Sequence, residues 1–337
     1  MATTKTTGEA LSDEDIAKTA EGVIQMVGEA RSALQTVVFG QDKVLDLTLA
    51  TIISGGHGLL VGVPGLAKTK LVEALGIVLG LDNRRIQFTP DLMPADILGS
   101  EILDEDADHR RSFRFVKGPI FTQLLMADEI NRASPRTQSA LLQSMQEHHV
   151  SISGQRYDLP HPFHVLATQN PIEQEGTYPL PEAQLDRFLM QIDITYPDRE
   201  AERRILIETT GASISSLKPV LTSQDLIAAQ KLVRFMPVGE KVLDVILDLV
   251  NLARPGEENT EFGKLLAWGA GPRASQALSV AARAKALMEG RLAPSVDDVI
   301  TLAEPILKHR MALTYSARVE GETISSLISR MITRIKG

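Results

Sequence analysis

The sequence contains no cysteine, which excludes disulfide bonds and metal sites built on thiolates. It also has no run of basic residues, and its formal net charge is −8 at pH 7. A protein that binds nucleic acid regardless of base sequence needs a positive surface, so this charge balance disfavours that class of function.

Long apolar stretches are missing as well. No segment reaches the roughly 18 to 20 uncharged apolar residues that cross a bilayer. The first residues, MATTKTTGEALSDED, lack the basic start and apolar core of a secretory signal. We therefore expect a cytoplasmic protein without a membrane span.

The 337 residues are 43% hydrophobic and 23% charged, which is ordinary for a globular protein, and this length suits two domains or one domain with an appendage. Residues 1–11 are small and polar, and we expect them to form a disordered leader. From residue 12 to 211, predicted strands alternate with predicted helices. This order is typical of an α/β core, in which a mostly parallel sheet is covered by helices on both faces.

The composition changes after Gly211. Residues 212–222 are rich in serine, contain Pro219 and are predicted to form a linker. From residue 223 to 337 the apolar residues follow helical spacing, and no strand pattern is found. The predicted fold is therefore an α/β core at 12–211 followed by an all-α domain at 223–337.

The clearest local signal is a glycine-rich turn between a predicted strand and a predicted helix. An apolar run at 57–61 is followed by GVPGLAKT at 62–69. A phosphate-binding loop has this form, since its backbone N–H groups and the helix N-terminus surround a polyphosphate. Ala67 stands where the pattern has its second glycine. A glycine-rich turn with an unrelated lysine is the alternative interpretation.

This loop predicts that the protein binds ATP together with Mg²⁺. Lys68 would contact the β- and γ-phosphates, and the Thr69 hydroxyl would hold the metal ion. The predicted nucleotide-binding residues of the loop are Gly62, Val63, Pro64, Gly65, Leu66, Ala67, Lys68, Thr69 and Lys70.

Polar residues follow two further apolar strands. The run at 124–127 is followed by Asp128 and Glu129, and ligands of parallel α/β sheets bind at the carboxyl ends of the strands. Asp128 would assist Mg²⁺, and Glu129 would activate the attacking water as a general base. Asn170 follows the predicted strand 163–168 and could contact the γ-phosphate or this water. The alternatives are a charged strand end and a turn-forming asparagine.

These motifs in series resemble the MoxR family of AAA+ ATPases. The chain carries GVPGLAKT at 62–69, LLMADEINRASPRTQSALLQSMQE at 124–147, VLATQNP at 165–171, LPEAQLDRF at 180–188 and GPRA at 271–274. The resemblance covers roughly residues 20–320. It implies an AAA+ P-loop core followed by a helical lid domain, with Lys68 and Thr69 as the Walker A pair, Asp128 and Glu129 as the Walker B pair, and Asn170 as sensor 1.

The resemblance also assigns two arginines. Arg187 matches the arginine finger, which inserts into the nucleotide site of a neighbouring subunit, and Arg273 matches sensor 2 in the lid. Both would stabilise the charge on the γ-phosphoryl group in the transition state. The alternatives are a surface ion pair of Arg187 with Glu182 or Asp186, and a helix-start position for Arg273.

Three further segments gain an interpretation from the family. Val38, Phe39 and Gly40 match the segment that packs on adenine. Residues 90–118 match an insert, and the predicted hairpin at 150–159 lies before sensor 1; in such proteins both face the pore of a ring. Phe113 and Phe115 would either grip a client protein or form a small hydrophobic pad.

The family further implies a homo-oligomeric ring, most often a hexamer, that hydrolyses ATP. MoxR proteins resemble chaperones that mature or activate partner complexes, often ones with von Willebrand factor A-type domains and metal cofactors. One alternative is a DNA-remodelling AAA+ motor, which the net charge of −8 disfavours. Another is an adaptor that binds ATP to assemble but barely hydrolyses it, which the presence of Glu129, Asn170 and Arg187 disfavours.

The histidines do not predict a metal site. His148 and His149 are adjacent on a predicted strand and would point to opposite faces of it. His161 and His164 lie on either side of a predicted turn. Residues 309–310, His-Arg, are expected to lie on a helix surface.

Overall fold

The structure is a computed structural model and describes residues 13–105, 111–173, 176–210, 217–256 and 261–336. The predicted leader at 1–11 and residues 212–216 of the predicted linker lie outside the described residues. Among the residues that the structure describes, no helix combines the length and the apolar character needed to span a bilayer.

The core is a five-stranded parallel sheet with the strand order β2-β5-β8-β1-β9. This confirms the α/β prediction. Most of its strands are short runs of buried apolar residues, as expected for a parallel sheet covered on both faces. The strands are β1 Gly58–Val61, β2 Asn83–Gln87, β5 Leu124–Asp128, β8 His164–Gln169 and β9 Met190–Asp193.

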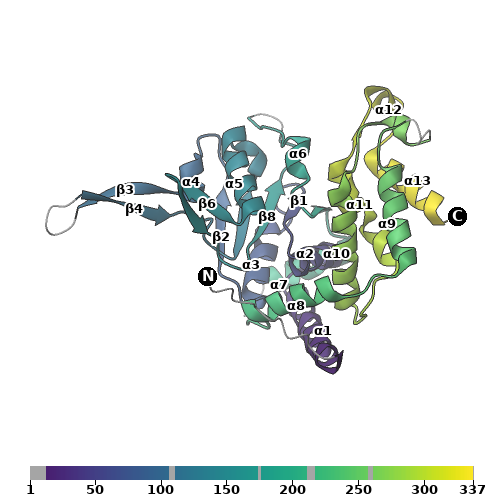
Figure 1. The fold of residues 1–337 in the computed structure, drawn as a ribbon, viewed down its shortest axis with the longest axis horizontal. Coiled ribbons are helices and arrows are strands. Elements are labelled where there is room, and N and C mark those ends of the chain that lie inside the picture. The colour runs from purple at the N-terminus through teal and green to yellow at the C-terminus, as the bar shows by residue number, and fades with distance from the viewer. Residues whose placement is uncertain (1–12, 106–110, 174–175, 211–216, 257–260, 337) are drawn as a thin grey trace, which may run out of the picture.

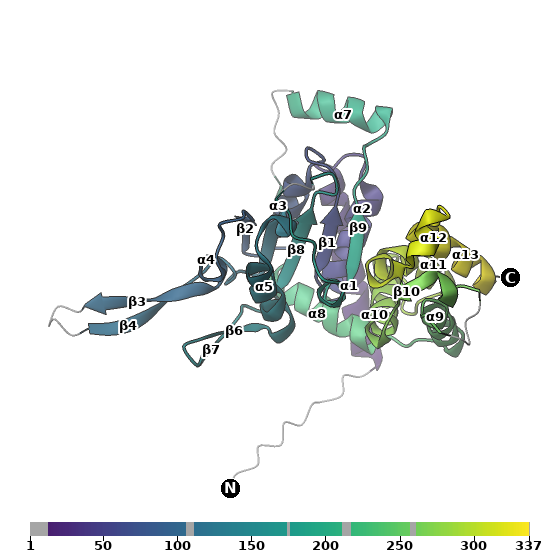
Figure 2. The ribbon, with the colours of Figure 1, turned by 90° about the horizontal axis from the view of Figure 1, so that it is seen from above.

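Alternate residues of β5 pack into two hydrophobic cores. Leu124 and Met126 belong to a core shared with α1, α2, α3 and the C-terminal helices, whereas Leu125 and Ala127 belong to a core that includes α5. Figures 1 and 2 show the helices on the two sides of the sheet. The helices of this part are α1 Asp13–Gln35, α2 Asp42–Ile53, α3 Lys68–Val78, α5 Pro135–Glu147, α6 Glu182–Leu185 and α7 Arg199–Thr210, with the 3-10 segment η1 Ile130–Arg132.

The predicted insert at 90–118 consists of a short helix and a hairpin that extends away from the sheet (Figure 1). Its elements are α4 Pro94–Leu98, β3 Gly99–Glu105 and β4 Arg111–Lys117. The second predicted hairpin is also present, with β6 His149–Ile152 and β7 Gln155–Asp158.

The two hairpins touch each other, and this contact separates the two alternatives for the phenylalanines. The ring of Phe115 stacks on Tyr157 with a centroid distance of 4.1 Å, and Ser153 donates a hydrogen bond to Glu101. Phe115 is therefore part of a hydrophobic pad between the hairpins. Phe113 is 73% exposed and remains open to contact with another molecule.

The residues described after 222 are mainly helical, as predicted, with one short antiparallel ladder among them. The sequence did not predict this ladder, because two or three residues are too few to show strand alternation. The elements are α8 Ser223–Phe235, α9 Glu240–Leu252, η2 Gly263–Leu265, β10 Leu266–Trp268, α10 Pro272–Met288, α11 Val296–Leu307, η3 Lys308–Arg310, β11 Ala312–Leu313, α12 Tyr315–Val319 and α13 Ile324–Lys336.

The described residues of this helical region share their core with the α/β part. Its buried residues join one hydrophobic cluster with those of α1, α2 and α3. Helix α8 contacts α1 and α2 as well as α10, so it lies between the two parts (Figure 2). The domain boundary at 212–222 stays a prediction.

Candidate functional site

The glycine-rich loop connects β1 to α3 with the backbone geometry that its sequence predicts. Gly62 packs against β9 so closely that an added Cβ would lie 2.7 Å from the Ile194 carbonyl oxygen. Ala67 adopts φ 57°, a left-handed conformation that costs an L-residue roughly 1–2 kcal/mol. Alanine in place of the second glycine of the pattern therefore introduces local backbone strain directly before Lys68.

Lys68 is the first residue of α3, and its side chain folds back over the loop. Its Nζ donates a hydrogen bond of 2.6 Å to the Gly62 carbonyl oxygen. Burial lowers the Lys68 pKa, while the nearby carboxylates of Asp128 and Glu129 partly oppose that effect. Thr69 is half-buried in the same helical turn. The structure thus brings the predicted lysine close to both predicted carboxylates.

Asp128 ends β5 and is held on both of its oxygens. Arg85 lies 2.6 Å from Oδ2, and the Thr168 hydroxyl donates to Oδ1 at 2.5 Å. Thr168 also accepts a hydrogen bond of 2.8 Å from the Glu129 N–H. One threonine on β8 therefore holds both the carboxylate of Asp128 and the backbone of Glu129.

Glu129 turns away from the strand because its φ is 56°, in the left-handed region. Its Oε2 accepts hydrogen bonds from Gln87 at 2.8 Å and from Arg132 at 2.9 Å. Burial of Asp128 and the turned backbone of Glu129 give the two carboxylates different surroundings, as their different predicted roles require.

Asn170 follows β8, which lies between β5 and β1 in the sheet. Its Oδ1 accepts a hydrogen bond of 3.2 Å from the Ile172 N–H, and its Nδ2 lies 3.5 Å from Glu173. The turn-forming alternative is thus present in the structure. Asn170 nevertheless lies at the same sheet edge as the loop, Asp128 and Glu129, because all three strands are parallel.

Four residues that organise this site were not predicted from the sequence. Arg85 and Thr168 hold Asp128, and Gln87 and Arg132 hold Glu129. Thr168 stands inside the motif VLATQNP and could have been found there. Arg85 and Gln87 come from β2, and only the pairing of β2 with β5 shows that they reach this site.

A small cavity of about 110 Å³ lies beside the loop. Two of the three residues predicted to pack on adenine line it, Val38 and Phe39. Gly40 does not line the cavity; it adopts φ +67° and packs so closely on Ala201 that an added Cβ would clash with it. The other lining residues are Val37, Gln41, Gly65, Leu66, Ala67, Lys70, Pro197 and Ile205.

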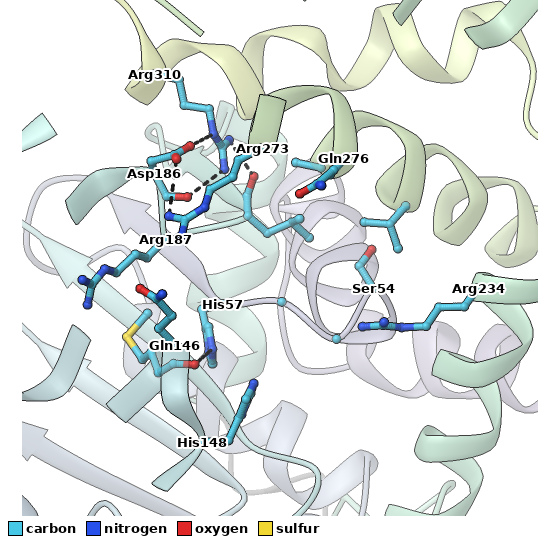
Figure 3. A pocket seen from close by; sticks show the side chains of 16 residues that line it. Ser54, His57, Gln146, His148, Asp186, Arg187, Arg234, Arg273, Gln276 and Arg310 are labelled. Carbon is cyan, nitrogen blue, oxygen red and sulfur yellow. Dashed lines mark hydrogen bonds and ion pairs between the residues drawn. The ribbon is translucent and has the colours of Figure 1, made fainter. Parts of the chain in front are cut away.

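A larger cavity of about 340 Å³ lies between the amino ends of the strands and helix α10 (Figure 3). Arg187 and Arg273 both line it. Arg273 lies 3.5 Å from Asp186, whereas the Arg187 side chain makes no ion pair among the described residues. The predicted surface ion pair of Arg187 is therefore not found there. Arg273 does start a helix, directly after Pro272, and also faces this cavity.

The two arginines cannot reach the glycine-rich loop of their own chain. Arg187 precedes β9, and the Leu189 N–H donates to the His57 carbonyl at the start of β1. The loop begins at Gly62, after the other end of β1. Five residues of extended chain lead from His57 to Gly62, and they span about 16 Å.

The prediction that His309 and Arg310 lie on a helix surface is wrong. Helix α11 ends at Leu307, and the 3-10 turn that follows directs both side chains inward, leaving them 5% and 2% exposed. Arg310 pairs with Asp186 at 2.7 Å, and His309 Nε2 lies 3.0 Å from the Phe188 carbonyl oxygen.

We expect the protein to lose stability in mild acid because of two buried histidines. Burial lowers the pKa of His57 to about 3 and that of His164 to about 4, from 6.5. The unfolded chain would bind protons below about pH 6.5 that the folded chain does not, so the free energy of unfolding falls as the pH drops towards 4. Each histidine contributes up to about 1.4 kcal/mol per pH unit.

Urea unfolding at several pH values between about 7 and 5 measures this slope. His164→Asn should reduce the slope, because it removes one of the protons whose uptake is linked to unfolding. A midpoint that stays constant over this range would contradict the assignment of both rings as neutral and buried.

Comparisons with known proteins agree with this arrangement. The profile of a family described as ATPase family associated with various cellular activities (AAA) matches residues 57–190, and that of the AAA lid domain matches 259–331. The chain is similar to Chaperone MoxR1 of Mycobacterium tuberculosis, with 41% identity over 94% of this chain and 84% of that protein. It is also similar to Protein MoxR of Paracoccus denitrificans, with 34% identity over 85% of this chain and 88% of that protein.

A solved structure of a protein from Cytophaga hutchinsonii has the same fold, with a TM-score of 0.87 and 36% identity. The match covers 95% of this chain and 97% of that one.

Proposed function

The chain belongs to the MoxR family of AAA+ ATPases, and from this premise we propose that it hydrolyses ATP at sites shared between neighbouring copies of itself. The observation that carries the proposal is the position of two half-sites at opposite edges of one sheet. The loop, Asp128 and Glu129 lie at the carboxyl ends of the strands, which we call the loop edge. Arg187 and Arg273 lie at the amino ends of the strands, which we call the arginine edge. In this proposal, each half would be completed by the other half of a second copy.

The loop edge would bind the phosphates and the metal. The loop leads into the N-terminus of α3, which has no side-chain cap, and an uncapped helix N-terminus suits a polyphosphate. The Thr69 hydroxyl and the Asp128 carboxylate offer the oxygen ligands that Mg²⁺ prefers, so the residues present fit this ion. When bound, Mg²⁺ would neutralise charge on the phosphate oxygens. Lys68 would leave the Gly62 carbonyl and pair with the γ-phosphate.

Glu129 would act as the general base. In the structure its carboxylate is paired with Arg132 and Gln87. A water that replaced one of these partners could give its proton to Glu129 while attacking the γ-phosphorus, and ADP would leave as the bond from its β-phosphate oxygen to the γ-phosphorus breaks. Asn170 would orient that water or bind the γ-phosphate. Val38 and Phe39 in the adjacent cavity would pack on the base.

The arginine edge would complete the site of the next copy. Arg187, which has no carboxylate partner among the described residues, is free to stabilise charge that develops on the γ-phosphoryl group. Arg273 lies on the same cavity wall and would assist it. Repeating this head-to-tail contact closes a ring when the rotation allows it, and we propose a hexamer, as the family resemblance implies.

For the cellular role we propose a chaperone-like action on partner protein complexes, in line with the family and with the relative named Chaperone MoxR1. Partners with von Willebrand factor A-type domains and metal cofactors are the class that the family resemblance indicates. The exposed Phe113 on the β3–β4 hairpin is the contact that we propose for such a client.

Lys68→Ala should weaken ATP binding by about 10- to 100-fold, because it removes a hydrogen bond between charged groups worth roughly 1.5–3 kcal/mol. Titration with a fluorescent ATP analogue measures the affinity, while phosphate release and particle mass report turnover and ring formation. Lys241→Ala, an exposed lysine on α9, is the control. Unchanged binding in Lys68→Ala would refute the loop as the nucleotide site. Turnover that requires DNA and falls steeply with salt would favour the DNA-remodelling alternative.

A further inference from the structure

The buried arginine of the lid, Arg310, directs nearly all of its donors at one segment of the core. Its Nε donates to the Asp186 carboxylate at 2.7 Å. Its Nη atoms donate to three backbone carbonyls of the same segment, those of Asp186 at 3.3 Å, Phe188 at 2.6 Å and Leu189 at 3.1 Å. A single side chain from η3 thus holds residues 186–189 on both sides of Arg187.

The other residues of η3 reinforce this contact. His309 Nε2 lies 3.0 Å from the Phe188 carbonyl oxygen, and Lys308 pairs with Asp193 at the end of β9. All three side chains of η3 therefore contact the polypeptide from Asp186 to Asp193. The same turn is covalently continuous with α11, so this part of the core and the lid are tied together.

Asp186 extends the link to the second arginine of the cavity. Its Oδ1 binds Arg310, and its Oδ2 lies 3.5 Å from Arg273 (Figure 3). Arg187 follows Asp186 directly in the chain. One carboxylate consequently connects the buried lid arginine with both arginines that face the cavity.

Stability alone gives a weak reason for this arrangement. Desolvation of a guanidinium costs several kcal/mol, and a buried ion pair is often no more stable than apolar side chains of similar size. A planar group with five donors in fixed directions does, however, define the position of everything it binds. The geometry of Arg310 therefore fits a positioning role better than a stabilising one.

We propose that Arg310 is a positioning residue for catalysis in the neighbouring copy: by holding residues 186–189 it sets where Arg187 and Arg273 project. This inference rests on the proposed function, in which those two arginines act on the next subunit's nucleotide. It also has a consequence for movement. Because Arg310 belongs to the lid, a shift of the lid carries the arginine edge with it.

Arg310→Lys tests the proposal, since lysine keeps the charge but lacks the planar fork. We expect the turnover number to fall by about 10- to 100-fold, because misplacing a catalytic group causes a loss of this order. The KM for ATP and the particle mass should change little. Asp186→Asn is the second variant, in case Arg310→Lys does not fold. Arg291→Lys is the matched control, because Arg291 pairs with the buried Asp298 in the lid and does not touch residues 186–189.

Mixed rings distinguish a positioning role from a structural one. Glu129→Gln copies lack the base but keep their arginines, so adding them to Arg310→Lys copies should restore turnover at sites that combine an intact base with intact arginines. Near-normal turnover of both Arg310→Lys and Asp186→Asn would overturn the inference. A loss of turnover that mixing does not restore would also overturn the inference, provided that mixing restores the turnover of Arg187→Ala in the same assay. Failure of Arg187→Ala itself to lose or regain turnover would instead refute the proposed function.

Discussion

Glu129→Gln is expected to bind ATP like the unaltered chain and to hydrolyse it about 10²- to 10⁴-fold more slowly, the usual contribution of a general base. Glutamine has the same shape and can still accept the hydrogen bonds from Gln87 and Arg132. What it cannot do is take a proton from water. The variant should therefore fold, bind nucleotide and assemble, with a defect confined to the chemical step.

Single-turnover phosphate release, together with ATP affinity and thermal unfolding, checks this expectation. Glu173→Gln is the matched control, because Glu173 is another carboxylate close to this group, 3.9 Å from Arg132 and 3.5 Å from Asn170. A small effect of Glu173→Gln beside a large effect of Glu129→Gln identifies the base. The reverse result would transfer that role to Glu173, and equal turnover in all three proteins would show that neither carboxylate is the base.

Local sequence signals predicted the loop edge well. The strand ends, the glycine-rich turn and the carboxylate pair are all encoded within a few residues, and parallel strands necessarily place their carboxyl ends at one edge. The strand predicted before the glycine-rich turn and the helix predicted after it are β1 and α3, which lie directly on either side of it. In each of these cases the pattern that forms the element is contained in the element itself.

Contacts between distant segments could not be predicted in the same way. Arg85 and Asp128 are 43 residues apart and meet because β2 pairs with β5. Arg310 and Asp186 are 124 residues apart, and they meet because the lid packs against the start of β9. No local spacing signals such a pair.

The misassignment of residues 309–310 has a local physical cause. Extending the helical period of α11 past Leu307 predicts an exposed face for the charged His-Arg pair. The chain instead changes to a 3-10 turn, which alters the residues per turn and rotates both side chains into the interior. A charged residue can then be buried because the carbonyls of residues 186–189 satisfy its donors.

Arg187→Ala should reduce turnover by about 10³-fold or more, the range found when an arginine finger is absent. ATP affinity should be retained, because Arg187 lies before β9, at the other end of the strands from the loop of its own chain. Arg234→Ala is the matched control, since Arg234 lines the same cavity from the end of α8. A much smaller effect of Arg234→Ala would show that the position of Arg187, and not the positive charge of the cavity, is what matters.

The decisive measurement for Arg187 is the turnover of mixed rings as the proportion of two inactive variants is varied. Arg187→Ala copies keep the loop and the base, and Glu129→Gln copies keep the arginine. Neither should hydrolyse ATP at an appreciable rate alone, yet a mixture should, because the two intact halves meet at some of the contacts between copies. Turnover that peaks at intermediate proportions and disappears on dilution below the assembly concentration is the signature of a shared site. If Arg187→Ala stays fully active, or if no mixture regains activity although mass measurements show mixed assemblies, the site is complete within one chain and the arginine edge needs another explanation.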